Sequence, residues 1–354
     1  MIHFLKRLFC LNLLFFLCIL GRNSVCRILI HVISILPIEE VIMIKKIMPL
    51  IILSILLSIS LQAQTSDGID EWLDELSNYS GTYLDANVRG YCTPLADAFG
   101  ASVSSGLFRS AKISTFGLHF YVGVSSMGAF MSDDQTMFTA RFPGVDLNNP
   151  LDDQYVTGTP TLFGNSSGKI IRVDTPSGRH TVKIQGIGFK FFPMVAPHIT
   201  VGNFLGTQLS LRWMDFKLND DLGQFRLFGY GFQHSISQYF LLSPIDLSFG
   251  FFIHKFDIEA DIAKLTLQTS YFGLQASKSF AMLTVYGGIG TELSSLRLQF
   301  SPSQLNQPID LTITGKNGSR MNAGIGLSLA IVKINVDYNI GAQKTVAMGV
   351  GLGF

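Results

Sequence analysis

Histidine and serine are the residues of this chain with the clearest potential for catalysis, and their spacing argues against it. Five histidines follow residue 63, and none has the His-Glu-x-x-His spacing of a zinc site. In the stretch HSIS at 234–237, Ser235 and Ser237 face away from His234, because side chains alternate across a strand. We therefore predict no enzymatic activity, no catalytic residue, no metal and no cofactor.

Cysteine chemistry is equally restricted. Three of the four cysteines lie before residue 27, which leaves Cys92 alone in the remainder. One thiol forms neither an internal disulfide nor a multi-cysteine metal site. We interpret Cys92 as a small buried residue.

The last ten residues, 345–354 (TVAMGVGLGF), indicate which kind of fold positions these side chains. Apolar residues occupy every second position, with Ala or Gly between them, and Phe354 is the final residue. A closed barrel in a lipid bilayer needs such a strand, since its outer face meets hydrocarbon and both edges are paired. Outer-membrane barrels typically end on an aromatic residue that the barrel assembly machinery recognises, so Val350, Leu352 and Phe354 are the predicted assembly signal.

Segments of period two extend back from this strand and predict an all-β, transmembrane antiparallel barrel. We expect fourteen strands, with twelve as the alternative, at 100–109, 114–125, 136–142, 180–190, 197–203, 206–217, 224–234, 244–256, 262–275, 281–300, 308–314, 321–329, 331–340 and 345–354. An even count puts both ends of the barrel in the periplasm. The longest break, 143–179, is then a loop outside the cell.

Polar residues on the inner face of two strands are the candidate lumen residues. In 331–340 they are Lys333, Asn335, Asp337 and Asn339, opposite a fully apolar face. In 244–256 they include Asp246 and His254. Lys333 and Asp337 either pair with each other or line a polar lumen.

Apolar and polar residues also alternate along the strands of a soluble β-sandwich, but the composition supports a membrane barrel. Hydrophobic residues make up 47% of the 354 residues and charged residues only 14%, against roughly 25% charge in soluble domains. A net charge of +1 without a basic run argues against nucleic-acid binding. Membrane lipids are the expected surroundings.

The N-terminal region predicts export. Residues 43–63 combine two lysines with an apolar run and end at Ala63, the pattern of a cleaved signal peptide. Residues 1–42 are either an over-extended start before Met43 or a membrane anchor. Residues 64–98, with apolar positions at 69, 72, 73 and 76 at helical spacing, predict a helical plug or lid before a barrel at 99–354. The expected location is the outer membrane of a Gram-negative-type cell.

Three short motifs carry a family resemblance: PLADAFG at 94–100, SGLFRSA at 105–111 and TPTLFG at 159–164, together with the strand at 116–124. With them, residues 69–354 resemble an outer-membrane barrel family of unknown function, similar in architecture to the long-chain fatty acid transporter (FadL-like) group. The resemblance implies a fourteen-stranded barrel, a plug in the lumen, and apolar substrates that leave sideways through the wall. The Asn-Pro-Ala signature of those transporters is absent, since Leu151 follows Asn149-Pro150.

Three functions follow as hypotheses. The first is passive, porin-like transport of small hydrophobic molecules, which predicts a hydrophobic ligand and an apolar pocket beside the plug. The second is a structural or assembly role as a scaffold for surface or secretion partners, favoured by a filled lumen and an ordered loop at 143–179. The third is a lipid-modifying enzyme, which requires a converging His and Ser that the sequence does not supply.

Overall fold

The computed structural model describes residues 80, 83–146, 152–175, 178–217, 223–240, 243–259, 263–301, 309–316 and 318–354. All of them belong to the larger of two compact units, Ser58–Phe354. The predicted signal peptide, residues 1–42 and the apolar positions 69, 72, 73 and 76 lie outside the described residues. Among the helices that the structure does describe, none is long and apolar enough to cross a membrane.

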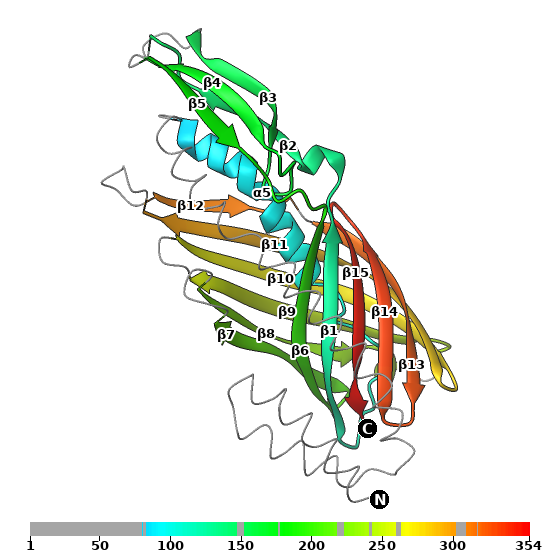
Figure 1. Cartoon of the computed structure of the whole chain (residues 1–354). Helices are drawn as coiled ribbons and strands as arrows, with labels where there is room; N and C mark the ends of the chain where they lie inside the picture. The colour runs from blue at the N-terminus through cyan, green and yellow to red at the C-terminus, as the bar shows by residue number, and fades with distance from the viewer. Residues whose placement is uncertain are drawn as a thin grey trace, which may run out of the picture. The chain divides into compact units, whose positions relative to one another are not determined.

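Ten antiparallel strands of the described residues close into a barrel (Figure 1). In order around the wall they are β1 (His119–Phe130), β6 (Phe191–Phe204), β7 (Thr207–Lys217), β8 (Gln224–Ser235), β9 (Asp246–Glu259), β10 (Ala263–Phe280), β11 (Leu283–Phe300), β13 (Ser319–Leu329), β14 (Val332–Ile340) and β15 (Lys344–Gly353). β15 pairs with β1 from Thr345↔Ala129 to Gly353↔Tyr121, which closes the ring. The predicted closed antiparallel barrel is confirmed.

The predicted counts of fourteen and twelve strands are both wrong. No strand forms at 100–109, because helix α5 (Leu84–Val103) continues into it. The segments 136–142 and 180–190 do contain strands, but these pair in hairpins outside the wall. The hairpins are β2 (Met137–Phe142) with β3 (Gln154–Pro160), and β4 (Lys169–Thr175) with β5 (Gly178–Ile184).

The fourth surplus strand, β12 (Ile309–Thr314), lengthens the wall without adding a position to it. β12 pairs with β11 from Ser295 to Phe300, and β13 pairs with the same strand from Leu283 to Thr291. The two strands therefore lie end to end along one edge of β11. Periodicity detects both, but only their register shows that they share one place in the barrel.

Turn lengths distinguish the two ends of the barrel. Two-residue turns at 205–206, 281–282 and 330–331 lie at one end, where β1 begins and β15 ends; we call this the short-turn rim. The opposite end, the loop rim, carries the long insertion between β1 and β6, with its 3-10 helix η2 (Asp133–Gln135). The predicted loop at 143–179 is at this rim, but it contains β3 and β4. Outer-membrane barrels place short turns in the periplasm and long loops outside.

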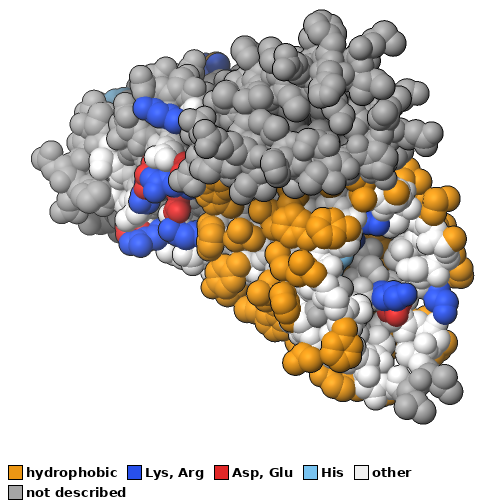
Figure 2. Space-filling model, turned by 90° about the horizontal axis from the view of Figure 1, so that it is seen from below, with side chains coloured by type: hydrophobic (Ala, Val, Ile, Leu, Met, Phe, Trp, Pro, Cys, Tyr) orange, Lys and Arg blue, Asp and Glu red, His pale blue; other side chains and the backbone are white. Residues whose placement is uncertain are grey.

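The exterior of the wall is apolar. On β14, Val336, Tyr338 and Ile340 are exposed, whereas Asp337 and Asn339 between them are buried. Figure 2 shows hydrophobic side chains gathered over the surface seen from below. Members of this exposed set include Leu209, Phe228, Tyr230, Phe272, Leu274, Ile289, Leu293, Ile325 and Met348. A surface of this kind requires hydrocarbon around it. A closed barrel can stand in hydrocarbon because its backbone N–H and C=O groups are paired with one another within the wall.

Helix α5 begins beside the hairpins and runs into the ring of strands (Figure 1), and it contacts β1, β6, β10, β11, β12 and β15, as well as β2. It crosses the boundary predicted between plug and barrel at 98/99. Close packing depends on small residues: a Cβ on Gly90 would lie 2.4 Å from the Phe138 ring, and one on Gly100 would lie 2.5 Å from Glu292 Oε1. After the helix, residues 104–118 lead to the start of β1 at the short-turn rim.

Candidate functional site in the barrel interior

Two buried arginines of the wall hold the C-terminal end of α5. The last carbonyls of a helix lack partners within it, and cations are favourable there. Arg212 of β7 donates to the carbonyl oxygens of Val103 (2.7 Å) and Gly106 (2.8 Å). Arg320 of β13 donates to the carbonyl oxygen of Ala101 at 3.1 Å. Both cations therefore fasten the end of the helix to opposite parts of the wall.

The charge of Arg320 is balanced within the wall. Arg320 Nη1 lies 2.7 Å from Glu292 Oε2 of β11, and both side chains are at most 5% exposed. Arg320 Nη2 also donates to the Ser105 hydroxyl at 2.9 Å. An ion pair at this depth is strongly destabilised if one partner is removed, because the remaining charge stays out of water.

The predicted lumen residues of β14 form a second attachment for the plug. Asp337 accepts hydrogen bonds from Asn339 Nδ2 (2.7 Å), the Tyr286 hydroxyl (3.3 Å) and the backbone N–H of Gly106 (3.4 Å). Asn335 is buried beside them, with its Nδ2 atom 3.5 Å from the Tyr286 hydroxyl. The structure thus brings three of the four predicted β14 residues together around the chain that leaves α5.

The other candidate residues lie apart from this cluster. Lys333 does not pair with Asp337; it donates to the Ala330 carbonyl oxygen at 2.9 Å, near the short-turn rim. His254 is buried in the interior, whereas Asp246 is half-buried where β9 begins. Among the described residues, no three His, Cys, Asp or Glu side chains gather into a metal site.

The remaining sequence-based candidates are placed as follows. His234 hydrogen-bonds with Thr207 Oγ1 (2.7 Å) and the Tyr239 hydroxyl (2.9 Å), the latter in the 3-10 helix η4 (Ser237–Tyr239). Ser235 and Ser237 contact each other, 3.3 Å apart. In the predicted assembly signal, Val350 and Leu352 are half-buried, while Phe354 is exposed and exchanges two backbone hydrogen bonds with Phe120.

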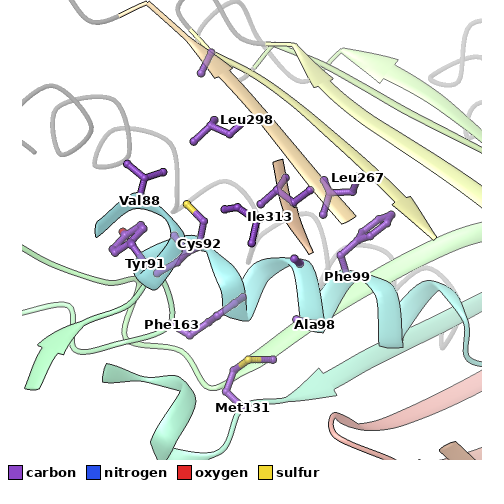
Figure 3. Close-up of a cluster of buried hydrophobic side chains, with 14 of the residues drawn as sticks. Val88, Tyr91, Cys92, Ala98, Phe99, Met131, Phe163, Leu267, Leu298 and Ile313 are labelled. Carbon is purple, nitrogen blue, oxygen red and sulfur yellow. The ribbon is translucent and has the colours of Figure 1, made fainter. Parts of the chain in front are cut away.

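Towards the loop rim the interior changes from polar to apolar. Here the first turns of α5 pack against inward-facing side chains of the wall and of the hairpins, and Figure 3 shows Val88, Cys92 and Phe99 among them. Phe99 stacks on Phe256 of β9 with ring centroids 5.3 Å apart. We call this group the apolar chamber. Its further members include Tyr91, Phe163, Met194, Phe225, Leu267, Leu298 and Ile313.

The barrel wall is split beside the apolar chamber. β6 and β7 pair from His198↔Arg212 to Val201↔Leu209 and again at Phe204↔Thr207. Among the described residues on the side of the loop rim, 191–197 of β6 pair only with β1, and 213–217 of β7 pair only with β8. Pro193 and Pro197 occupy this part of β6, and proline is confined to strand edges because it has no N–H to donate.

Aromatic pairs line both sides of the split. Phe192 of β6 packs edge-on against Phe163 (6.1 Å), and Phe216 of β7 stacks on Phe225 (5.4 Å). Outward-facing residues of β7 change from Leu209 and Leu211 to Trp213 and then to charged side chains. Trp at such a boundary is typical of the membrane interface, so the split begins near the level where the hydrocarbon ends.

Sequence reasoning missed Arg212, Arg320 and Glu292. Each is a charged residue on the inward face of a strand whose outward face is apolar, and that contrast is the signal that marks them. Charge in a lipid-facing barrel strand is costly on the outer face, so an isolated arginine indicates an interior position. The partners of these arginines, however, are distant in sequence. Arg212 binds carbonyls more than 100 residues away, and Arg320 binds the Ala101 carbonyl 219 residues away.

The fold and its interior define the class of protein: a closed transmembrane-type β-barrel whose lumen is filled by its own N-terminal helix. Residues 43–354 match a family of unknown function, DUF6588, and the chain belongs to this family. The predicted membership of an uncharacterised barrel family is thereby confirmed. The similarity to the long-chain fatty acid transporter group stays a prediction.

Comparisons with individual proteins are weaker. No curated protein matches the chain. Among solved structures, it is similar to the outer membrane protease OmpT of Escherichia coli (10% identity, TM-score 0.29, covering 69% of this chain and 98% of OmpT). It is also similar to the translocator domain of the autotransporter NalP of Neisseria meningitidis (10% identity, TM-score 0.27, covering 78% of this chain and 98% of that domain). A third similar structure is the Ralstonia pickettii toluene transporter TbuX (8% identity, TM-score 0.25, covering 69% of this chain and 91% of TbuX). Such low TM-scores assign no activity, which has to be inferred from the barrel itself.

Proposed function

We propose that this chain is a non-catalytic outer-membrane barrel that lets small hydrophobic molecules pass from its loop rim sideways into the membrane. The observation that carries this proposal is the split between β6 and β7 beside the apolar chamber. A membrane-spanning wall normally pairs all of its backbone groups. An interruption lined by Phe192 and Phe216 therefore supports an exit for apolar molecules.

The polar part of the interior supports a sideways route over a straight one. At the C-terminal end of α5, the plug is held by Arg212, Arg320 and Asp337, and the surrounding side chains are hydrophilic. An apolar molecule that continued towards the short-turn rim would displace these hydrogen bonds and receive none in return. Leaving through the split avoids that cost, because the molecule passes the Phe192 and Phe216 rings and reaches the membrane at the boundary of the hydrocarbon. Passage requires the first turns of α5 to move, since they fill the apolar chamber.

A cross-link across the split tests this route. In a Cys92→Ala background, Val195→Cys and Asp215→Cys place thiols on the outward faces of β6 and β7, where the ladder would continue if the strands were paired. A short bifunctional maleimide then ties the two edges together. In cells with a lipopolysaccharide outer leaflet, we expect the entry rate of a hydrophobic dye to fall to that of cells without the protein.

The matched control is Val201→Cys with Leu209→Cys, a pair at which the same two strands are already paired. Cross-linking this pair leaves the split unchanged, so dye entry should stay at the uncross-linked rate. Equal dye entry for both cross-linked pairs and for the uncross-linked protein would refute the sideways route.

A scaffold role is the second candidate, and one observation favours it. The insertion at the loop rim is built of hairpins, and Arg141 of β2 stacks on Tyr83 (3.9 Å) and pairs with Asp153, which ties the first hairpin to the segment before α5. An ordered surface of this kind is suited to holding a partner protein. Replacing residues 144–152 by a short Gly-Ser linker should then abolish partner capture while dye entry persists.

A further inference from the structure

A cavity of about 320 Å³ opens in the interior at the short-turn rim, away from the apolar chamber. The chain between α5 and β1 supplies one side of it, with Arg109 and Lys112. The wall supplies the other side, with His119 of β1 and Lys333 of β14. Its volume lies at the lower end of the range for small-molecule sites, roughly 300–1,000 Å³.

All the ionisable side chains of this cavity other than Tyr121 are basic. Arg109, Lys112, Lys333 and His119 line it, and its lining includes no Asp or Glu. The carboxylate of Asp337, also on β14, accepts hydrogen bonds from Gly106, Tyr286 and Asn339. Within the described residues, the ion pairs of the chain involve none of Arg109, Lys112 and Lys333.

Arg109 is fixed in position although it has no carboxylate in contact. Its guanidinium lies 3.7 Å from the centre of the Tyr121 ring, and Nη2 donates to the Thr200 hydroxyl at 3.0 Å. A guanidinium held in this way presents its remaining N–H groups in a fixed fork, the geometry that suits phosphate and carboxylate oxygens. Holding a cation inside a barrel without a counter-charge is costly, and an anionic ligand would remove that cost.

Neutral donors complete the lining. Hydroxyl and amide groups surround the four basic side chains, and these neutral groups belong to Ser110, Ser114, Gln208, Ser279, Thr284, Ser328 and Asn335. Charge-assisted hydrogen bonds from Lys and Arg supply affinity for an oxyanion, while hydroxyls satisfy its remaining lone pairs.

We propose that this cavity is a binding site for a small molecule carrying a phosphate group, entered from the short-turn rim. The shared chemistry is that of a phosphate oxyanion, whether it belongs to a soluble phosphate ester or to a phospholipid head group. The site is separate from the split and does not depend on the transport proposal: it would exist equally in a scaffold barrel.

Equilibrium dialysis of the full chain in neutral detergent tests the proposal with three probes: inorganic phosphate, glycerol 3-phosphate and a short-chain phosphatidylglycerol. We expect at least one probe to bind with one-to-one stoichiometry, and more weakly as salt rises, since screening weakens charge attraction. Binding of glycerol 3-phosphate assigns a soluble source, and binding of phosphatidylglycerol alone assigns a lipid source. Absence of binding for all three probes would overturn the proposal.

Charge variants locate the site. Lys112→Gln with Lys333→Gln should weaken binding by about a hundredfold or more, from the loss of two charge-assisted hydrogen bonds, whereas replacing both by Arg should preserve it. The control, Lys278→Gln with Lys344→Gln, removes the same charge at two positions outside the cavity lining. Heat-dependent gel mobility verifies that each variant is folded. An equal loss of affinity in the control, or none in the test variant, would also overturn the assignment.

Discussion

Breaking the buried ion pair between Arg320 and Glu292 should release the plug without opening the barrel wall. The two side chains are 5% and 1% exposed, with Nη1 and Oε2 2.7 Å apart. Removing one member of such a pair costs about 3–5 kcal/mol, because the remaining charge stays buried. Arg320 also donates to the Ala101 carbonyl and the Ser105 hydroxyl, so Arg320→Met loosens the attachment of α5 directly.

Cys92 supplies the assay, because it lies on α5 inside the apolar chamber and is only 6% exposed. When the helix opens and closes faster than the thiol reacts, the labelling rate is proportional to the open population. At 1.4 kcal/mol per factor of ten, a cost of about 3–5 kcal/mol raises this rate roughly 100-fold to several thousand-fold. The measurement uses a maleimide on a chain whose other three cysteines are replaced by serine.

A double-mutant cycle separates charge from packing. Replacing both partners, as Arg320→Met with Glu292→Leu, leaves no buried charge, and such replacements are often nearly neutral. We therefore expect the double variant to label more slowly than either single variant. Labelling of Arg320→Met at the wild-type rate, or strictly additive effects in the cycle, would refute the conclusion that this pair holds the plug.

Three further predictions concern the plug and its surroundings. Gly100→Ala should destabilise the protein by about 1–3 kcal/mol in urea unfolding despite the better helix propensity, because its Cβ would lie 2.5 Å from a carboxylate oxygen of the wall. Burial raises the pKa of Cys92 to about 12, so this thiol should resist iodoacetamide even at pH 9 until the protein is unfolded. The Tyr83 hydroxyl and the Arg141 guanidinium hold the pKa of Asp153 below its usual value. The resulting stability is present above about pH 4 and is lost as the pH falls through the lowered pKa. The melting temperatures of wild type and Asp153→Asn should therefore differ at pH 7 and converge once the pH is below that pKa.

The ten strands of the wall could be predicted from sequence because lipid on one side and polar groups on the other impose a period of two. Residues 332–340 show this most clearly, with Val336, Tyr338 and Ile340 outside and Asp337 inside. The same period occurs in 136–142, where it reflects a hairpin whose partner is β3. Periodicity reports that a strand has two different faces, but it does not identify the neighbouring strand, which is why the count was too high.

The end of the helix could not be predicted for a different reason. Residues 100–109 are rich in Gly and Ser, which are weak helix formers. The helix nevertheless continues to Val103, because Arg212 and Arg320, on two distant strands, donate hydrogen bonds to its last carbonyl oxygens and so cap its C-terminal end. A local propensity is overridden here by contacts that exist only once the barrel register is set.

The interior of the barrel is divided into two kinds of surroundings along one helix, and this division suggests how the plug moves. Near the loop rim, the first turns of α5 pack through apolar side chains such as Val88 and Cys92, interactions that an apolar molecule can replace at little cost. At its C-terminal end, the helix is held by charged hydrogen bonds from Arg212 and Arg320, which an apolar molecule cannot replace. An apolar ligand would therefore displace the first turns of the helix and leave its last turn in place. That outcome opens the route to the split between β6 and β7 while the lower lumen stays closed.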